Sequence, residues 1–129
     1  AERNRRAAML EFKVAVEKSG VVSYLKQKNI DLDIKGFFVM SAMEGETIVG
    51  MGAISMTPDF AVVEELVCDD ETIAYGMGKA LLNSLDLGGV ARVLIKNERL
   101  YPLAERLRFT KTEQGSYEVS LYGYFTAGC

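Results

Sequence analysis

The chain has 129 residues, a formal net charge of −3 and no histidine, and 49% of its residues are apolar. This length and composition predict a single packed domain over residues 1–129. The small negative charge argues against a nucleic-acid or membrane-surface partner. The lack of histidine excludes Ser/His and Cys/His catalytic pairs and histidine metal sites, so we expect no metal centre.

Cysteine usage and hydropathy predict a reduced, cytoplasmic protein. The two cysteines, Cys68 and Cys129, are too few for a disulfide framework. No apolar run reaches the roughly 18 residues that span a membrane, and no signal peptide is recognisable. Because the sequence begins with Ala1, we also consider that it is one domain of a longer protein.

The first third of the chain is predicted to contain helices and then a hairpin. Apolar residues recur through residues 7–27, and Ser19-Gly20 interrupts them, which favours two short helices. The period then changes to that of β-strands, and residues 37–43 and 47–56 form a predicted hairpin.

A strand, a helix, a second strand and a second helix are predicted next. Residues 60–68 and 90–95 are β-rich, and the segment from Thr72 to Gly88 between them has one apolar helical face. A crossover of this length implies that the two strands are parallel. The remaining predicted elements are a helix over residues 98–107 and a hairpin formed by residues 109–112 and 117–125. This order predicts a mixed sheet with helices on both faces.

The junction between the strand at residues 60–68 and the helix after it carries the main motif. Residues 66–68 (Leu-Val-Cys) end the strand, and residues 76–79 (Gly-Met-Gly-Lys) lie at the expected helix start. A helix N-terminus presents unpaired N–H groups and a partial positive charge, and glycine lets an anion approach the backbone. The motif therefore indicates a phosphate-binding turn. The alternative is a tight turn whose glycines only allow close helix packing.

Residues 36–125 resemble the GNAT superfamily of acyl-CoA N-acyltransferases in their order of elements and in two motifs. The family's Leu-x-Val strand end and Gln/Arg-x-x-Gly-x-Gly/Ala turn correspond to residues 66–68 and 73–78. Its downstream asparagine and its helix ending in Tyr-x-x-Leu-Gly-Phe correspond to Asn97 and residues 104–109. The resemblance implies an α/β (α+β) fold, in which a mixed, mostly antiparallel sheet has a central, splayed parallel strand pair and helices on both faces.

The resemblance also implies an acetyl-CoA-dependent N-acetyltransferase that passes the acetyl group directly to a primary amine. The cosubstrate's pantetheine arm would bind the backbone around Cys68 and Asp70, and its pyrophosphate the N–H groups from Ala74 to Lys79. The implied cofactor-binding residues are Leu66, Cys68, Asp70, Ala74, Tyr75, Gly76, Met77, Gly78, Lys79 and Asn97. We also expect Asn97 to cap the helix that follows it.

Two side chains are candidate catalytic residues. Glu64 and Glu65 occupy the strand that borders the acceptor site in the family, and strand alternation points one of them inward. Glu64 shares the parity of Leu66, so we expect its carboxylate to accept the amine proton through water. Tyr101 lies one helical turn before residue 104 and can protonate the leaving thiolate. The structural alternatives are a salt-bridged strand residue and a ring packed on the sheet.

The chain departs from the family pattern where the cosubstrate would bind. Ile73 stands at the phosphate-binding Gln/Arg position and Ala104 at the position of the helix-borne tyrosine. Residues 69–71 (Asp-Asp-Glu) repel a pyrophosphate by about 1 kcal/mol each if solvated. A second hypothesis is therefore a GNAT-like binding or regulatory module that has lost catalysis. Residues 117–122 of the last hairpin are a candidate edge strand for a homodimer.

Overall fold

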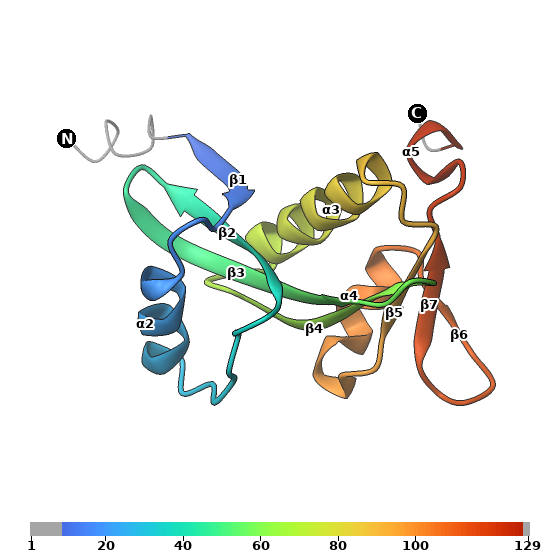
Figure 1. Ribbon diagram of the computed structural model, residues 1–129, viewed down its shortest axis with the longest axis horizontal. Coiled ribbons are helices and arrows are strands. Elements are labelled where there is room, and N and C mark those ends of the chain that lie inside the picture. Colours follow the sequence, from blue (N-terminus) through green and yellow to red (C-terminus); the bar gives the residue numbers. More distant parts are fainter. Residues whose placement is uncertain (1–8, 128–129) are drawn as a thin grey trace.

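The computed structural model describes residues 9–127, which form one seven-stranded sheet with helices on both faces (Figure 1). The strands are β1 (Leu10–Val14), β2 (Phe38–Glu44), β3 (Thr47–Met56), β4 (Ala61–Cys68), β5 (Arg92–Ile95), β6 (Thr110–Lys111) and β7 (Tyr117–Ser120). The helices are α2 (Ser19–Gln27), α3 (Glu71–Leu87), the 3₁₀ helix η1 (Glu98–Leu100), α4 (Tyr101–Arg106) and α5 (Tyr124–Ala127).

The strand order in the sheet is β1-β2-β3-β4-β5-β7-β6. All neighbouring strands are antiparallel except β4 and β5, which are parallel. This confirms the predicted mixed, mostly antiparallel sheet with a central parallel pair.

The central part of the chain folds as its sequence predicts. β2 and β3 form the expected hairpin, and Gly45 supplies the positive φ of 64° in its two-residue turn. α3 begins at Glu71, one residue before the expected start, and Asp70 caps it by accepting a hydrogen bond from Ile73 N–H at 2.8 Å.

The N-terminal segment differs from the prediction. We expected two helices within residues 7–27, but residues 10–14 form β1, which pairs with β2, and only α2 is helical. Leu10, Phe12 and Val14 are spaced two residues apart, which is the period of a strand and not of a helix. The first two residues of the predicted segment lie outside the described residues.

The C-terminal strand is shorter than predicted and lies inside the sheet. β7 stops at Ser120, and the chain turns at Gly123, with a φ of 69°, into α5 instead of continuing as a strand to Phe125. β7 pairs with β5 on one side and β6 on the other, so it is not the edge strand that we predicted. The edges of the sheet are β1 and β6.

Two apolar clusters, one on each face of the sheet, join the layers. The larger cluster packs α3 and α4 on the sheet and includes the fully buried Ile54, Met77 and Leu81. The smaller cluster packs α2 on β2 and β3 and includes Tyr24 and Met51. Figure 1 shows α2 and α3 on opposite sides of the sheet. Removing apolar surface from water stabilises a fold by about 25 cal/mol per Å². The larger cluster therefore holds α3 and α4 in place against β4 and β5.

Among residues 9–127, no helix is both long enough and apolar enough to cross a membrane. The same residues contain no group of three or more Cys, Asp or Glu side chains placed to hold a metal ion.

Candidate functional site

The parallel strands β4 and β5 pair over a short distance and then separate. Ala61 pairs with Val93 and Val62 with Leu94, and these are the pairs that join the two strands within the described sheet. The edge of β4 beyond Val62 therefore has no strand beside it, and the sheet opens at this point.

A β-bulge at Glu64 changes which side chains of β4 face the opening. The register with β3 shifts between Ala53 and Ile54, which leaves Glu64 without a pairing residue. Val63 and Leu66 consequently share one face and one core cluster, although they are three residues apart. Because of the bulge, Glu64 and Leu66 do not point to the same face of β4, contrary to our expectation. The half-buried Glu64 carboxylate instead accepts a hydrogen bond from the hydroxyl of a serine on β3.

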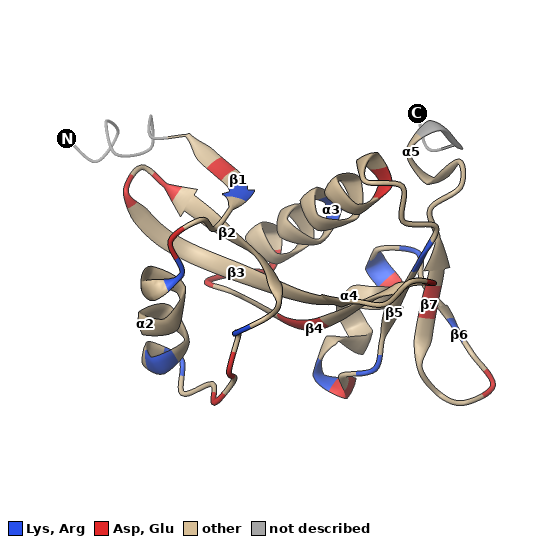
Figure 2. Cartoon of the chain, viewed as in Figure 1, with Lys and Arg blue, Asp and Glu red and all other residues tan. Residues whose placement is uncertain are grey.

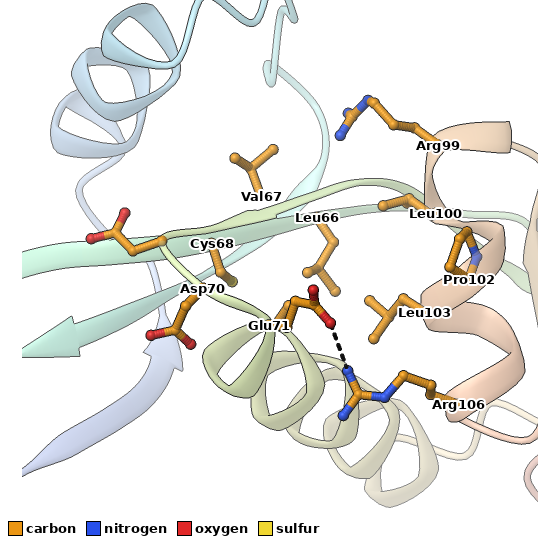
Figure 3. Close-up of a pocket in the computed structure, with 12 residues that line it drawn as sticks. Leu66, Val67, Cys68, Asp70, Glu71, Arg99, Leu100, Pro102, Leu103 and Arg106 are labelled. Atoms are coloured by element: carbon orange, nitrogen blue, oxygen red, sulfur yellow. Dashed lines mark ion pairs between the residues drawn. The ribbon is translucent and has the colours of Figure 1, made fainter.

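A cavity of about 430 Å³ lies between the end of β4, the start of α3 and the η1–α4 segment (Figure 3). It is lined by Leu66, Val67, Cys68, Asp69, Asp70, Glu71, Ala74, Arg99, Leu100, Pro102, Leu103 and Arg106. Its leucine and proline side chains give it an apolar wall. Its acidic residues come from the β4–α3 junction and its arginines from η1 and α4 (Figure 2). The predicted cofactor-binding residues that the structure brings together here are Leu66, Cys68, Asp70 and Ala74.

The open edge of β4 presents backbone groups to the cavity. Asp69 N–H donates to Val49 O on β3 at 2.8 Å, and successive residues of a strand direct their backbone groups to opposite sides. The backbone groups of Cys68 and Leu66 therefore point away from β3, toward the cavity. The N–H of Leu66 already donates to Glu65 Oε1 at 3.0 Å, so a side chain occupies the first of these donors.

Glu65 and Arg99 form an ion pair that joins β4 to η1. The Glu65 side chain is only 8% exposed, and its Oε1 accepts from both Arg99 Nη2 and Leu66 N–H. The Arg99 side chain is 52% exposed and borders the cavity. Arg99 was not predicted as a site residue, because it lies 34 residues from Glu65 along the chain and outside both motifs.

All three carboxylates that we expected to repel a pyrophosphate have partners within the protein, and that of Glu71 is Arg106. Asp69 accepts a hydrogen bond from Tyr24 Oη at 2.8 Å and pairs with Lys28 Nζ at 3.1 Å. Burial and the hydrogen bond to Asp69 raise the pKa of Tyr24, so its hydroxyl remains a donor at neutral pH. Asp70 caps α3. These contacts offset part of the negative charge at the rim.

Arg106 lies at the rim of the cavity, opposite the start of α3. Its guanidinium is 3.7 Å from the Glu71 carboxylate and 5.0 Å from the centroid of the Tyr75 ring (Figure 3). The Glu71 side chain is 94% exposed, so solvent screens this ion pair and it contributes little to stability. Arg106 can therefore exchange this partner for a ligand anion. The sequence motifs gave no signal for it.

The start of α3 does not offer the backbone donors that the glycine motif predicts. Because α3 begins at Glu71, the N–H groups of residues 75–79 lie inside the helix and bond to carbonyls four residues earlier. The N–H groups of Ile73 and Ala74 donate to Asp70 Oδ1 and Asp70 O at 2.8 and 3.0 Å. In this conformation these amides are not available to a pyrophosphate, which corrects the role expected of the backbone at residues 74–79.

The two glycines of the motif allow close packing on α3. A Cβ added to Gly76 would approach Phe12 Cζ on β1 to 2.7 Å, and one added to Gly78 would approach Leu107 Cδ1 to 2.6 Å. Phe12 therefore covers the place where a phosphate would meet Gly76, and Gly78 seats the end of α4. This is the structural alternative that the sequence left open.

The other side chains of the motif also point away from the cavity. Met77 is fully buried in the core. Lys79 Nζ lies 5.9 Å from the ring centroid of Tyr75, 5.0 Å from that of Tyr124 and 5.5 Å from that of Phe125. Such cation–π contacts contribute about 0.5–1 kcal/mol each at exposed sites, so the Lys79 charge helps to hold the C-terminal segment on α3.

Asn97 caps η1, as predicted, and also connects the two diverging strands. Its Oδ1 accepts a hydrogen bond from Arg99 N–H at 3.1 Å, and its Nδ2 donates to Glu64 O on β4 at 3.3 Å. Asn97 thus acts as a spacer at the point where the sheet opens.

Tyr101 lies outside the cavity. Its hydroxyl donates to Lys96 O at 3.3 Å, and its ring packs on Tyr117 with 4.7 Å between the centroids. It lines a separate hollow with Lys96 and Ser116. The structure therefore does not bring Tyr101 to Cys68 and the other residues of the cavity.

Cys68 lines the cavity as a free thiol. Burial, together with the charges of Asp69 and Asp70, raises the pKa of Cys68 to about 12. A thiol is nucleophilic only as a thiolate, so Cys68 is a poor nucleophile at neutral pH.

No protein-family model matches the sequence, and no curated protein sequence matches it. Solved structures match its fold. An N-acetyltransferase from Staphylococcus aureus Mu50 has a TM-score of 0.71 at 12% identity, over 89% of this chain and 99% of that one. The ribosomal-protein-S18-alanine N-acetyltransferase from Escherichia coli has a TM-score of 0.65 at 12% identity, over 88% and 94%. The PaiA N-acetyltransferase from Thermoplasma acidophilum, in complex with coenzyme A, has a TM-score of 0.54 at 13% identity, over 75% and 65%.

Other solved structures with this fold are named as acetyltransferases of the GNAT family. The chain therefore has the GNAT fold, as the two motifs and the order of elements predict.

Proposed function

We propose that the chain is an acetyl-CoA-dependent N-acetyltransferase that passes the acetyl group directly to a primary amine. The observation that carries the proposal is the cavity beside the open edge of β4, between the end of β4, the start of α3 and the η1–α4 segment, where the backbone of Cys68 faces an apolar wall. This shape suits a thin ligand arm that alternates amide and methylene groups. Proteins with the same fold are named as N-acetyltransferases, and one of them holds coenzyme A.

The residues at the rim suggest how this chain would hold the phosphates of the cosubstrate. The amides from Ile73 to Lys79 are engaged, and Phe12 covers Gly76. Arg106, in contrast, has only an exposed carboxylate as its ion-pair partner. We therefore assign the phosphate contact to Arg106, since a guanidinium binds phosphate through two parallel hydrogen bonds.

The transfer forms a bond from the amine nitrogen to the acetyl carbon and breaks the bond from that carbon to sulfur. The chain must position the two reactants and accept the amine proton. Glu64 is our candidate proton acceptor: its carboxylate takes part in none of the ion pairs among residues 9–127, and because it does not line the cavity it would accept the proton through water. The Glu65 carboxylate is already engaged by Arg99 and Leu66 N–H. Cys68 forms no acyl-enzyme, because its thiol stays protonated.

A titration calorimetry experiment with Arg106→Gln tests this assignment. Coenzyme A and pantetheine, which lacks the phosphates, are titrated into the wild-type chain and the variant. Loss of a charge-assisted contact of about 1.5–3 kcal/mol should weaken coenzyme A binding at least tenfold and leave pantetheine binding unchanged. Arg92→Gln is the matched control, because Arg92 also pairs with a carboxylate, at 2.8 Å, but does not line the cavity. No heat from coenzyme A at about 1 mM, which is a binding energy of only about 4 kcal/mol, would exclude the proposed enzyme.

A second candidate function is ligand binding without catalysis. Glu65 favours it, because its carboxylate occupies the N–H of Leu66 that a bound acetyl oxygen would otherwise reach. Transfer of labelled acetyl groups to a panel of amines, followed by mass spectrometry, distinguishes the two. Coenzyme A binding with no acetylated product would assign the binding function.

A further inference from the structure

β1 is an edge strand with outward-facing backbone groups. Among residues 9–127, β2 alone pairs with it. Ala15 N–H donates to Val39 O on β2 at 2.9 Å, so the backbone groups of Leu10, Phe12 and Val14 point away from β2 by alternation. Unpaired N–H and C=O groups on an edge strand are a template for another strand.

The sequence of β1 complements itself when the strand is reversed about Phe12. In an antiparallel pair of identical strands centred on Phe12, Leu10 lies opposite Val14 of the other copy. Glu11 then lies opposite Lys13 of the other copy, and Lys13 lies opposite Glu11 of the other copy. Opposite charges directly across two strands stabilise their pairing.

The geometry of the charged pair favours this arrangement. Glu11 and Lys13 lie on the same face of β1, 3.9 Å apart, and their side chains are 59% and 58% exposed. Their backbone groups face β2, so across the edge they occupy non-hydrogen-bonded positions, where opposing side chains are closest. Each copy thus offers an acidic and a basic side chain to its counterpart.

We propose that β1 pairs with β1 of a second copy of this chain, around a twofold axis at Phe12, to form one continuous sheet. The pairing covers apolar surface, because Leu10 is 38% exposed and Val14 is 50% exposed. Such an interface is isologous and closes after two copies. The opposite edge of the sheet, β6, has only two residues and offers no comparable strand.

The expected dimer is weak. One pair of five-residue strands buries less surface than the roughly 1,200–2,000 Å² of a stable protein interface. The dimer should therefore form in the micromolar range or above, where sedimentation equilibrium can detect it.

A charge-swap experiment tests the proposal. Sedimentation equilibrium is measured up to about 500 µM, the range expected of a small interface, for wild type, E11K, K13E and the double variant E11K/K13E. Each single variant places like charges opposite each other at both ends of the strand pair, so its dissociation constant should rise at least tenfold. The double variant restores opposite charges and should return to the wild-type value. Both side chains are exposed, so circular dichroism should show an unchanged fold.

Two results would overturn the proposal. The first is a wild-type chain that remains monomeric at the highest concentration. The second is equal association of all four proteins, which would place the contact elsewhere on the surface.

Discussion

Replacing Arg99 by alanine should destabilise the protein more than removing the charge of its partner. The Glu65 side chain is 8% exposed and accepts hydrogen bonds from Arg99 and Leu66 N–H. Without Arg99, a nearly buried carboxylate keeps a single neutral donor. Removing one partner of a fully buried pair costs about 3–5 kcal/mol. Because Arg99 is 52% exposed, water reaches this site, and we reduce the expected loss to roughly 2 kcal/mol.

The variant Glu65→Gln provides the comparison. A glutamine keeps the shape of the side chain and an oxygen that accepts from Leu66 N–H, and it loses only the ion pair. We expect a loss of about 1 kcal/mol, the usual net value of one hydrogen bond or half-exposed ion pair. The double variant E65Q/R99A should be more stable than R99A alone, because it leaves no unpaired charge at this site.

Urea unfolding of wild type, R99A, E65Q and the double variant measures these differences. Equal losses for R99A and E65Q, or a double variant no more stable than R99A, would refute the reasoning that a buried charge depends on Arg99.

Two further predictions concern packing and alkaline stability. Gly78→Val should lower the free energy of unfolding by roughly 1–3 kcal/mol, because its Cβ would meet Leu107 Cδ1 at 2.6 Å. Urea unfolding should show a smaller loss when the same substitution is made in a Leu107→Ala variant. An equal loss in both backgrounds would contradict the contact. Folding raises the pKa of Cys68 from 9.0 to about 12 and raises that of Tyr24 above its ordinary 10.0. Each side chain therefore stabilises the folded state fully at pH values below its ordinary pKa. This stabilisation is lost as the pH rises through the pKa that the group has in the folded state. The melting temperature should therefore fall above about pH 9, and less steeply in a Tyr24→Phe, Cys68→Ser variant; parallel curves would contradict the assignment.

The elements that a local pattern defines were predictable from the sequence. The β2–β3 hairpin has alternating apolar residues around a glycine turn, and α3 has one apolar face after the capping residue Asp70. β1 was missed because its two-residue spacing, at Leu10, Phe12 and Val14, stands beside the helical spacing of α2 and was assigned to the same period. The strand at the C-terminus was predicted too long because the turn at Gly123 is flanked by aromatic residues that favour strands.

The candidate site was only partly predictable, because its side chains come from distant segments. Leu66 and Cys68, which the motif at the end of β4 indicated, both line the cavity. The bulge at Glu64 has no local sequence signal, so the expected parity was wrong. Whether Gly76 is open to a ligand depends on Phe12, which lies 64 positions earlier in the sequence, and no local pattern predicts that contact.

The short pairing of β4 with β5 has a consequence for ligand selectivity. Beyond Val62 the sheet does not set the distance between these strands. That distance depends on Asn97, which holds both sides of the opening, and on how closely α3 and α4 meet at Gly78. The width of the cavity therefore depends on the interface between α3 and α4. In the acetyltransferase that we propose, preference for a longer or shorter acyl chain can change through residues that never touch the ligand, while every residue lining the cavity stays the same.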